Sequence, residues 1–137
     1  MKYVLDTNAV SALMRGDAAT VARLAGLPRG DVSVPEPVHA EIEFGIQRLP
    51  PSKRREHLRA QHDRIRGEIP TALWTPEVSR EFGAIKTLLE RRGAPIEDLD
   101  VAIAAHARAA SATLVTANAR HMARIPGLDS EDWSPSA

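Results

Sequence analysis

Short apolar runs alternate along this chain with longer segments in which apolar residues recur every three or four positions. The short runs lie at residues 3–5, 32–34, 72–74 and 113–115, and a helix signal follows each of them. A short apolar run bounded by turn residues predicts a buried strand, whereas the longer recurrence predicts an amphipathic helix. Parallel strands need crossover connections, so this alternation predicts an α/β fold with a central parallel sheet of four to five short strands flanked by helices.

Cap residues mark where the predicted helices begin and end. Thr75 and Pro76 form an N-cap and a first-turn proline, and the helix that follows is predicted to close near Gly93. A second helix is predicted over about 37–49, after the second strand. Asp6 directly follows the first strand, where it is a candidate N-cap.

The length of 137 residues suits one domain, and we predict a single domain over residues 1–133 followed by a frayed tail at 134–137. Residues 129–133 are expected to add an edge strand or to dock Trp133 on the body. The chain contains no cysteine, which excludes disulfides and thiolate metal sites. No run approaches the roughly 18 apolar residues of a membrane helix, so the expectation is a cytoplasmic protein that does not enter a membrane.

The charges are balanced, with eighteen basic and eighteen acidic residues, so composition alone does not indicate a nucleic-acid binder. The basic residues are nevertheless clustered between positions 53 and 66, where six Lys or Arg accompany two acids. We interpret this stretch as the solvated face of a helix, with a nucleic-acid surface as the alternative.

Three acids stand out because the pattern places them beside apolar side chains, and Asp100 is the clearest. At about 100° per residue, Asp100 projects from the helical stripe that contains Ile96 and Ile103, whereas Asp98 faces away. An ionised carboxylate removed from water is costly unless it is paired, hydrogen-bonded or bound to a cation. Asp100 therefore needs a partner, while Asp98 is interpreted as a residue that caps the helix or complements its dipole.

Glu41 raises the same question in the second predicted helix. It lies beside the apolar stripe formed by Val38 and Gly45, whereas Glu43 is turned about 200° further round, toward solvent. For any one of these acids, a salt bridge to one of the fifteen arginines remains an alternative to a functional role.

Two strand ends complete the candidate site. Asp6 follows the first strand and Asn118 follows the last, and carboxyl ends of parallel strands meet at one edge of a sheet. Together with Glu41 and Asp100 they would form an oxygen-only site, which suits Mg²⁺ or Mn²⁺ rather than zinc. No histidine pair has the spacing of a zinc helix motif, so we assign no metal role to His39, His57, His62, His106 or His121.

Clustered carboxylates without a thiol, a Ser/His pair or a glycine-rich phosphate loop suit metal-activated water that attacks a phosphodiester. The acids would hold the metal ion, and the ion would lower the pKa of its water. Because an acidic site repels a polyanion, arginines near it would have to steer the substrate.

The ordered set of these motifs resembles PIN-domain ribonucleases, and specifically the VapC toxins of bacterial toxin–antitoxin modules. The matching segments are "YVLDTNAVSAL", "VSVPEPVHAEIEFGI" and "PIEDLDVAIAAHARAASATLVTANARHMARIPGLDSEDW". The resemblance runs nearly end to end and implies a PIN-like fold.

For individual residues, the resemblance implies that Asp6 and Asp100 ligate Mg²⁺, that Glu41 completes the acidic cluster, and that Asn118 takes the fourth polar position. Some family members carry a further acid after that asparagine, where this chain has His121 and Met122 instead.

The resemblance also implies a function and partners. The expected activity is site-specific cleavage of structured RNA such as tRNA by a toxin. The expected partners are a VapB-type antitoxin and a second copy of the chain, in a complex that reaches operator DNA only through the antitoxin.

Two other functions remain open on the residues alone. One is a small-molecule phosphohydrolase with an aspartyl nucleophile, although such enzymes usually carry a second acid two residues on, where this chain has Asn8. The other is a non-catalytic RNA- or protein-binding module that keeps the fold.

Overall fold

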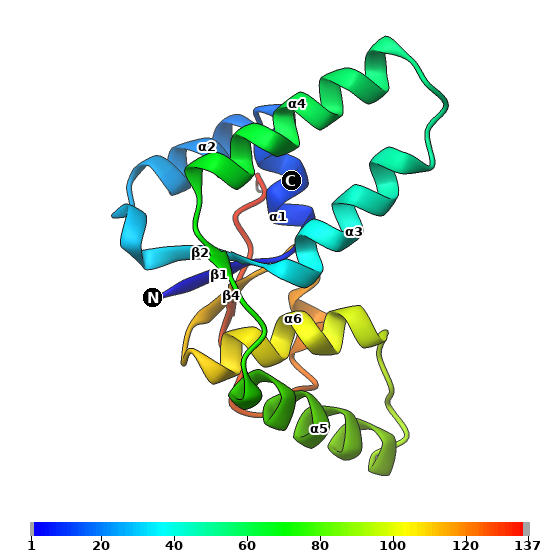
Figure 1. Ribbon diagram of the computed structural model, residues 1–137. Helices are drawn as coiled ribbons and strands as arrows, with labels where there is room; N and C mark the ends of the chain where they lie inside the picture. Colours follow the sequence, from blue (N-terminus) through cyan, green and yellow to red (C-terminus); the bar gives the residue numbers. More distant parts are fainter. Residues whose placement is uncertain (1, 136–137) are drawn as a thin grey trace.

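Residues 2–135 are described by the computed structural model, and this part of the chain forms five strands and seven α-helices (Figure 1). The strands are β1 (Tyr3–Leu5), β2 (Val32–Pro35), β3 (Thr71–Ala72), β4 (Thr113–Val115) and β5 (Ser130–Glu131). The helices are α1 (Thr7–Arg15), α2 (Ala18–Ala25), α3 (Glu36–Gln47), α4 (Lys53–Glu68), α5 (Pro76–Arg91), α6 (Asp98–Ala109) and α7 (Ala119–Met122).

All the strands pair in parallel, in the order β3-β2-β1-β4-β5. The central strand β1 is in register with both neighbours, since Tyr3 lies opposite Val32 of β2 and Thr113 of β4. The predicted α/β fold with a parallel sheet is therefore confirmed. Because β1, β2 and β4 run the same way, their carboxyl ends share one edge of the sheet.

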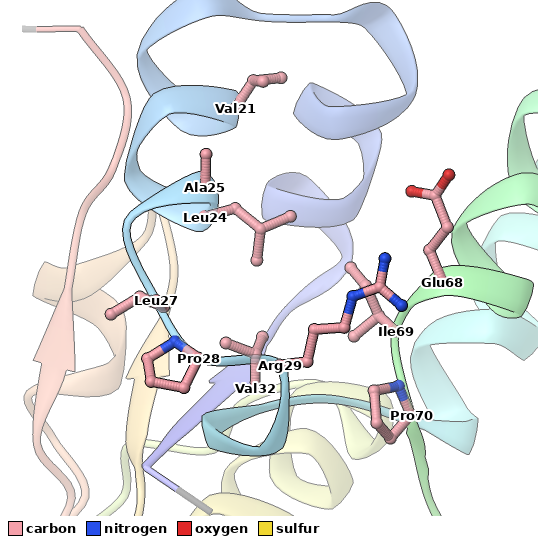
Figure 2. Close-up of a pocket in the computed structure, with 10 residues that line it drawn as sticks. All are labelled: Val21, Leu24, Ala25, Leu27, Pro28, Arg29, Val32, Glu68, Ile69 and Pro70. Carbon is pink, nitrogen blue, oxygen red and sulfur yellow. The ribbon is translucent and has the colours of Figure 1, made fainter.

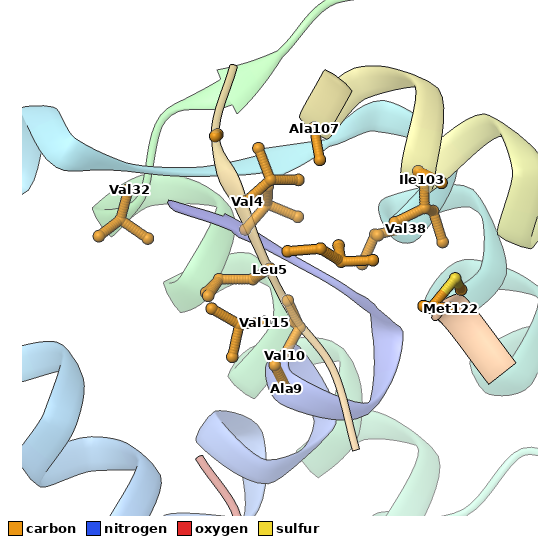
Figure 3. Packing of buried hydrophobic residues seen from close by; sticks show 14 of the residues in the cluster. Val4, Leu5, Ala9, Val10, Val32, Val38, Ile103, Ala107, Val115 and Met122 are labelled. Atoms are coloured by element: carbon orange, nitrogen blue, oxygen red, sulfur yellow. The ribbon is translucent and has the colours of Figure 1, made fainter. Parts of the chain in front are cut away.

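Helices cover both faces of this sheet, with α1, α2 and α4 on one side and α5 and α6 on the other (Figure 1). Successive side chains of a strand point to opposite faces. Figure 3 shows this alternation on β1, where Val4 points toward Ala107 of α6 and Leu5 toward Val10 of α1. All four side chains are buried, so β1 lies inside the core.

The helices predicted from cap residues and periodicity are confirmed as α3 and α5. Thr75 caps α5 by accepting a hydrogen bond from the Val78 amide at 3.3 Å, and the helix is followed by Gly93 at φ +65°. No helix in the described part of the chain is long and apolar enough to cross a membrane.

The third predicted strand, residues 72–74, is largely wrong. The observed β3 spans Thr71–Ala72, and Leu73 is 71% exposed. Trp74 leaves the sheet because its indole N–H donates to Ser79 Oγ at 2.6 Å and its ring packs against Phe82 of α5. The apolar run 72–74 therefore covers the last residue of the edge strand β3 and the first residues of the turn into α5.

The end of the chain shows both features expected of it. Ser130–Glu131 form the edge strand β5, and Trp133 is buried with its ring 5.7 Å from that of Tyr3. In the predicted frayed tail, the Ser134 amide donates to Asp132 at 2.8 Å, while residues 136 and 137 lie outside the described part. The domain boundary at residue 133 stays a prediction.

The basic stretch 53–66 belongs to α4 and is only partly a solvated face. Arg59 donates two hydrogen bonds to Glu43 of α3, at 2.8 and 3.0 Å, and Arg66 pairs with Glu36 of α3 at 3.0 Å. The prediction that Glu43 is turned to solvent is therefore incomplete, because this half-buried carboxylate joins α3 to α4. The ion pairs make α3 and α4 one hairpin that projects from the body (Figure 1).

Candidate active site

A pocket of about 320 Å³ opens at the carboxyl edge of the sheet and contains all four residues predicted for the site. It is lined by Asp6, Thr7, Asn8, Glu41, Asp100, Ile103, Asn118 and Met122. These residues come from the ends of β1 and β4 and from the helices α1, α3, α6 and α7. The topology thus gathers in one place side chains that are far apart in the chain.

Asp6 stands at the end of β1 and is also the N-cap of α1. Its carboxylate accepts a hydrogen bond from the Ala9 amide at 2.9 Å, and the residue is only 6% exposed. Burial raises the pKa of Asp6, hydrogen bonds from Thr116 and Ala9 oppose this shift, and the charge of Asp100 adds to it. Capping uses one oxygen, Oδ1, and the carboxylate still borders the pocket.

Glu41 reaches the pocket from α3, whose Val38 and Ile42 anchor the helix in the core. Its Oε1 accepts a short hydrogen bond from the hydroxyl of Thr7, the first residue of α1. This contact holds the Glu41 carboxylate beside the start of α1. Asp6 lies there too, because it directly precedes Thr7.

Asp100 lies in the first turn of α6, opposite Glu41. Burial raises the pKa of Asp100, the negative charge of Glu41 raises it further, and the nearby His121 lowers it. The two carboxylates are therefore close enough to repel each other. In residues 2–135, none of Asp6, Glu41 and Asp100 forms an ion pair with Lys or Arg, so the salt-bridge alternative does not account for them.

Asn118 occupies the N-cap position of α7, but its side chain makes no capping hydrogen bond. Its backbone amide instead donates to Thr116 Oγ1 at 2.9 Å. The side-chain amide of this exposed residue therefore remains available to the pocket.

Asp98 lies outside the pocket. It is the first residue of α6, where a negative charge complements the helix dipole, and it pairs with Lys86 of α5 at 3.0 Å. This placement agrees with its interpretation as a helix-end residue and distinguishes it from Asp100, two residues later.

Sequence reasoning did not predict how Thr7 and Thr116 support the acids. The Thr7 hydroxyl donates to Glu41, and Thr116 lowers the pKa of Asp6. Thr7 lies two residues after the end of β1, and Thr116 lies directly after β4. The apolar walls formed by Ile103 and Met122 were also missed as part of the site. The signal that could have revealed the threonines is a hydroxyl within two residues of the end of a strand that leads to the predicted site.

The oxygen atoms that line the pocket can be compared with the ligands that a divalent cation prefers. The pocket offers carboxylate and amide oxygens, and the two carboxyl groups with raised pKa values would each gain from a cation beside them. Over the described range, no three His, Cys, Asp or Glu side chains are close enough to hold one ion jointly. Mg²⁺ usually takes only one or two carboxylates and keeps several waters, so two acids such as Asp6 and Asp100 could hold such an ion.

Another pocket, with a largely apolar lining, lies elsewhere, between α2 and the end of α4. Figure 2 shows this pocket of about 270 Å³, in which Leu24, Val32 and Ile69 meet and the charged side chains are Arg29 and Glu68. A single carboxylate among apolar groups offers no cluster for metal-assisted chemistry. The acidic pocket is therefore the candidate active site.

Known proteins resemble this chain over nearly its whole length. Residues 3–128 match the PIN domain family. The chain is 31% identical over 135 residues to ribonuclease VapC2 of Rickettsia felis, which covers 97% of this chain and 98% of that protein. It is 28% identical over 134 residues to the tRNA(fMet)-specific endonuclease VapC of Shigella flexneri, covering 98% and 99% of the two chains.

Solved structures of VapBC complexes are also similar to this chain. The crystal structure of VapBC2 from Rickettsia felis, bound to a DNA fragment from their promoter, superposes with a TM-score of 0.87 at 28% identity and covers 98% of this chain and 100% of that one. The DNA-bound VapBC of Salmonella typhimurium superposes with a TM-score of 0.87 at 25% identity, covering 97% and 98%.

Proposed function

The chain belongs to the PIN-domain family, among the VapC ribonucleases, and from this premise we propose that it is a magnesium-dependent endoribonuclease that acts as the toxin of a toxin–antitoxin pair. The observation that carries the proposal is the convergence of Asp6, Glu41 and Asp100 on one pocket, where none of them forms an ion pair with a Lys or Arg of residues 2–135. A structural role would leave such acids paired with arginines, as Glu43 is.

The proposed roles follow from the position of each side chain. Asp6 and Asp100 would hold the Mg²⁺ ion, or Mn²⁺ in its place, which when bound supplies an activated water and offsets the charge of the phosphate. The Glu41 carboxylate, oriented by Thr7, accepts a proton from the attacking water. The Asn118 amide, free of a capping bond, donates a hydrogen bond to the substrate.

The substrate and partners are proposed from the relatives. A tRNA(fMet)-specific endonuclease among them supports tRNA as the RNA cleaved here. The two solved structures described above are VapBC complexes bound to DNA, which supports a VapB-type antitoxin that neutralises this chain and carries the contact with operator DNA. A homodimer of this chain within the complex is part of the same proposal.

RNA cleavage by the purified protein tests the proposed activity. We expect cleavage of bacterial tRNA with Mg²⁺ and none with EDTA, because the acids alone cannot activate water. Asp6→Asn and Asp100→Asn should each abolish cleavage, while Asp98→Asn should leave it unchanged, because Asp98 lies outside the pocket. Circular dichroism confirms that all variants are folded.

Two outcomes would contradict the proposal. Equal cleavage by the wild type and the pocket variants would remove these acids from the chemistry. Hydrolysis of small phosphoesters with no cleavage of RNA would favour a phosphohydrolase, for which the pocket offers Asn8 rather than a second acid after Asp6.

A further inference from the structure

Helix α3 carries an exposed aromatic side chain one turn beyond Glu41. Phe44 is 65% exposed, and the Arg48 guanidinium lies over its ring, 5.8 Å from the centroid. An aromatic face held beside a guanidinium is an arrangement that attracts a flat, polarisable ligand. The other aromatic side chain among the exposed large apolar residues of the described range, Trp74, differs because its indole N–H donates to Ser79 of α5.

The helix geometry places Phe44 and Arg48 in line with the active site. From Glu41, Phe44 lies about 4.5 Å further along the helix axis and about 60° round it, and Arg48 lies about 10.5 Å along and about 20° round. The opposite side of α3 is occupied, since Glu43 pairs with Arg59 of α4 and Ile46 is buried. Phe44 and Arg48 therefore extend the pocket side of α3 outward into solvent.

Basic residues continue this surface toward the tip of the α3–α4 hairpin, which projects from the body (Figure 1). Arg48, Lys53, Arg54 and Arg55 lie at this tip, and within the described residues none of them forms an ion pair. The arginines farther along α4 differ, because Arg59 and Arg66 are paired with acids of α3. The tip is thus a local excess of positive charge on a chain of zero net charge.

The chemistry of the proposed substrate explains why such a surface is needed. The acidic pocket repels phosphates, so an RNA strand must be held by cations outside it. Single-stranded RNA is bound by stacking its splayed bases on aromatic rings and Arg guanidinium planes. A base in a continuous duplex is not free to stack in this way.

We propose that Phe44 and Arg48 form a stacking platform for an unpaired RNA base next to the scissile phosphate, and that the hairpin-tip cations hold the adjoining backbone. The inference rests on the proposed ribonuclease function and extends it. It assigns Phe44 and Arg48 to substrate positioning, and it restricts the substrate to RNA that is unpaired where it is cut.

Binding of two RNA probes tests this platform. One is a stem–loop with 2-aminopurine in its loop, and the other is a fully paired hairpin of equal length; both are titrated against protein in an Asp6→Asn background, which prevents cleavage. Phe44→Ala should raise the Kd of the stem–loop roughly 5- to 150-fold, the range expected for one stacked base, with little change for the paired hairpin. Phe44→Trp should restore affinity, and the quenching of 2-aminopurine should be lost only in Phe44→Ala.

Two further variants sharpen the test. Arg48→Ala should weaken stem–loop binding and reduce the salt dependence of binding by about one phosphate contact. Leu73→Ala is the matched control, because this exposed apolar side chain is not part of the pocket or of the hairpin, and its Kd should equal that of the parent.

Unchanged affinity in Phe44→Ala would overturn the platform. So would a change in molecular mass by light scattering with unchanged RNA affinity, because Phe44 would then belong to a contact between copies of the chain. Failure of the ribonuclease function itself is seen separately, as an absence of Mg²⁺-dependent cleavage by the wild type. If the wild type cleaves tRNA and Phe44→Ala cleaves it with the same KM, only the platform is refuted.

Discussion

Acidification is expected to destabilise this protein through a buried histidine pair that joins α3, α4 and β3. His39 Nδ1 and His62 Nε2 share a hydrogen bond of 2.8 Å, and His39 Nε2 lies 3.2 Å from the Thr71 hydroxyl. His39 is 0% exposed and His62 3%. Protonation of both rings would place two charges in the core and remove the acceptor from their hydrogen bond.

The size of the effect follows from the pKa of His39. Burial, with a contribution from the positive charge of Arg66, lowers this pKa from 6.5 to about 4. The unfolded chain therefore binds a proton at a higher pH than the folded one, and the stability contributed by neutral His39 is present above pH 6.5 and lost as the pH falls toward 4. Linkage gives a loss of about 2 kcal/mol between pH 7 and pH 5. The lowered pKa of His62 acts in the same direction.

Urea unfolding at pH 7, 6 and 5 measures this loss. The comparison is between the wild type and the double variant His39→Leu/His62→Leu, which replaces both rings by apolar side chains. The Thr71 hydroxyl loses its contact with His39 in this variant, but that loss is the same at every pH and does not change the slope. The wild type should lose about 2 kcal/mol more than the variant over this range. The Glu43–Arg59 pair contributes little there, because hydrogen bonds from Arg59 lower the pKa of Glu43 from 4.5 to about 2 and both values lie below pH 5.

If the unfolding free energies of the two proteins changed equally with pH, the proposed role of the histidine pair would be refuted. Such a result would mean that the histidine pair is protonated or hydrated in the folded state. If the unfolding free energy of the wild type instead rose on acidification, the active-site carboxyl groups would have the larger effect on stability. Their pKa values are raised in the folded state, so their protonation stabilises the fold as the pH falls.

Three further predictions concern stability. Asp100→Asn should raise the Tm at neutral pH without metal, since the raised pKa means that the ionised group is unfavourable in the folded state, and added Mg²⁺ should raise the Tm of the wild type but not of the variant. Leu114→Ala should lower the unfolding free energy by about 2–5 kcal/mol in urea titrations, because this β4 side chain is fully buried. Thr75→Ala should cost about 1 kcal/mol in the same assay through loss of the α5 cap.

The part of the fold that could be predicted from sequence is the part whose side chains are buried in a regular pattern. The helices α3, α5 and α6 bury apolar stripes, and β1 lies in the core, so periodicity detected them. Helix α2 was not predicted, because it is only eight residues long and its apolar side is shallowly buried: Thr20 is its one buried residue and Val21 is 42% exposed. The strand β3 has two residues, too few to define an alternation.

The candidate site was predictable to a similar degree. The rule that parallel strands end at one edge was enough to bring Asp6 and Asn118 together. Glu41 and Asp100 lie on helices, and they were assigned to the same site because each interrupts an apolar pattern. The contacts that orient them were not predictable. The hydrogen bond from Thr7 to Glu41 joins residues 34 positions apart, and that between His39 and His62 joins residues 23 apart. Such pairs depend on how two helices face each other, which local pattern does not specify.

A crystal of the protein soaked with Mn²⁺, measured at an energy where manganese scatters anomalously, tests the proposed metal site. We expect one anomalous peak in the acidic pocket, about 2.1 Å from carboxylate oxygens of Asp6 and Asp100, and no peak in the same pocket of Asp100→Asn. A peak only outside this pocket, or an empty pocket at a Mn²⁺ concentration that supports RNA cleavage, would contradict the assignment of these two acids as the metal ligands.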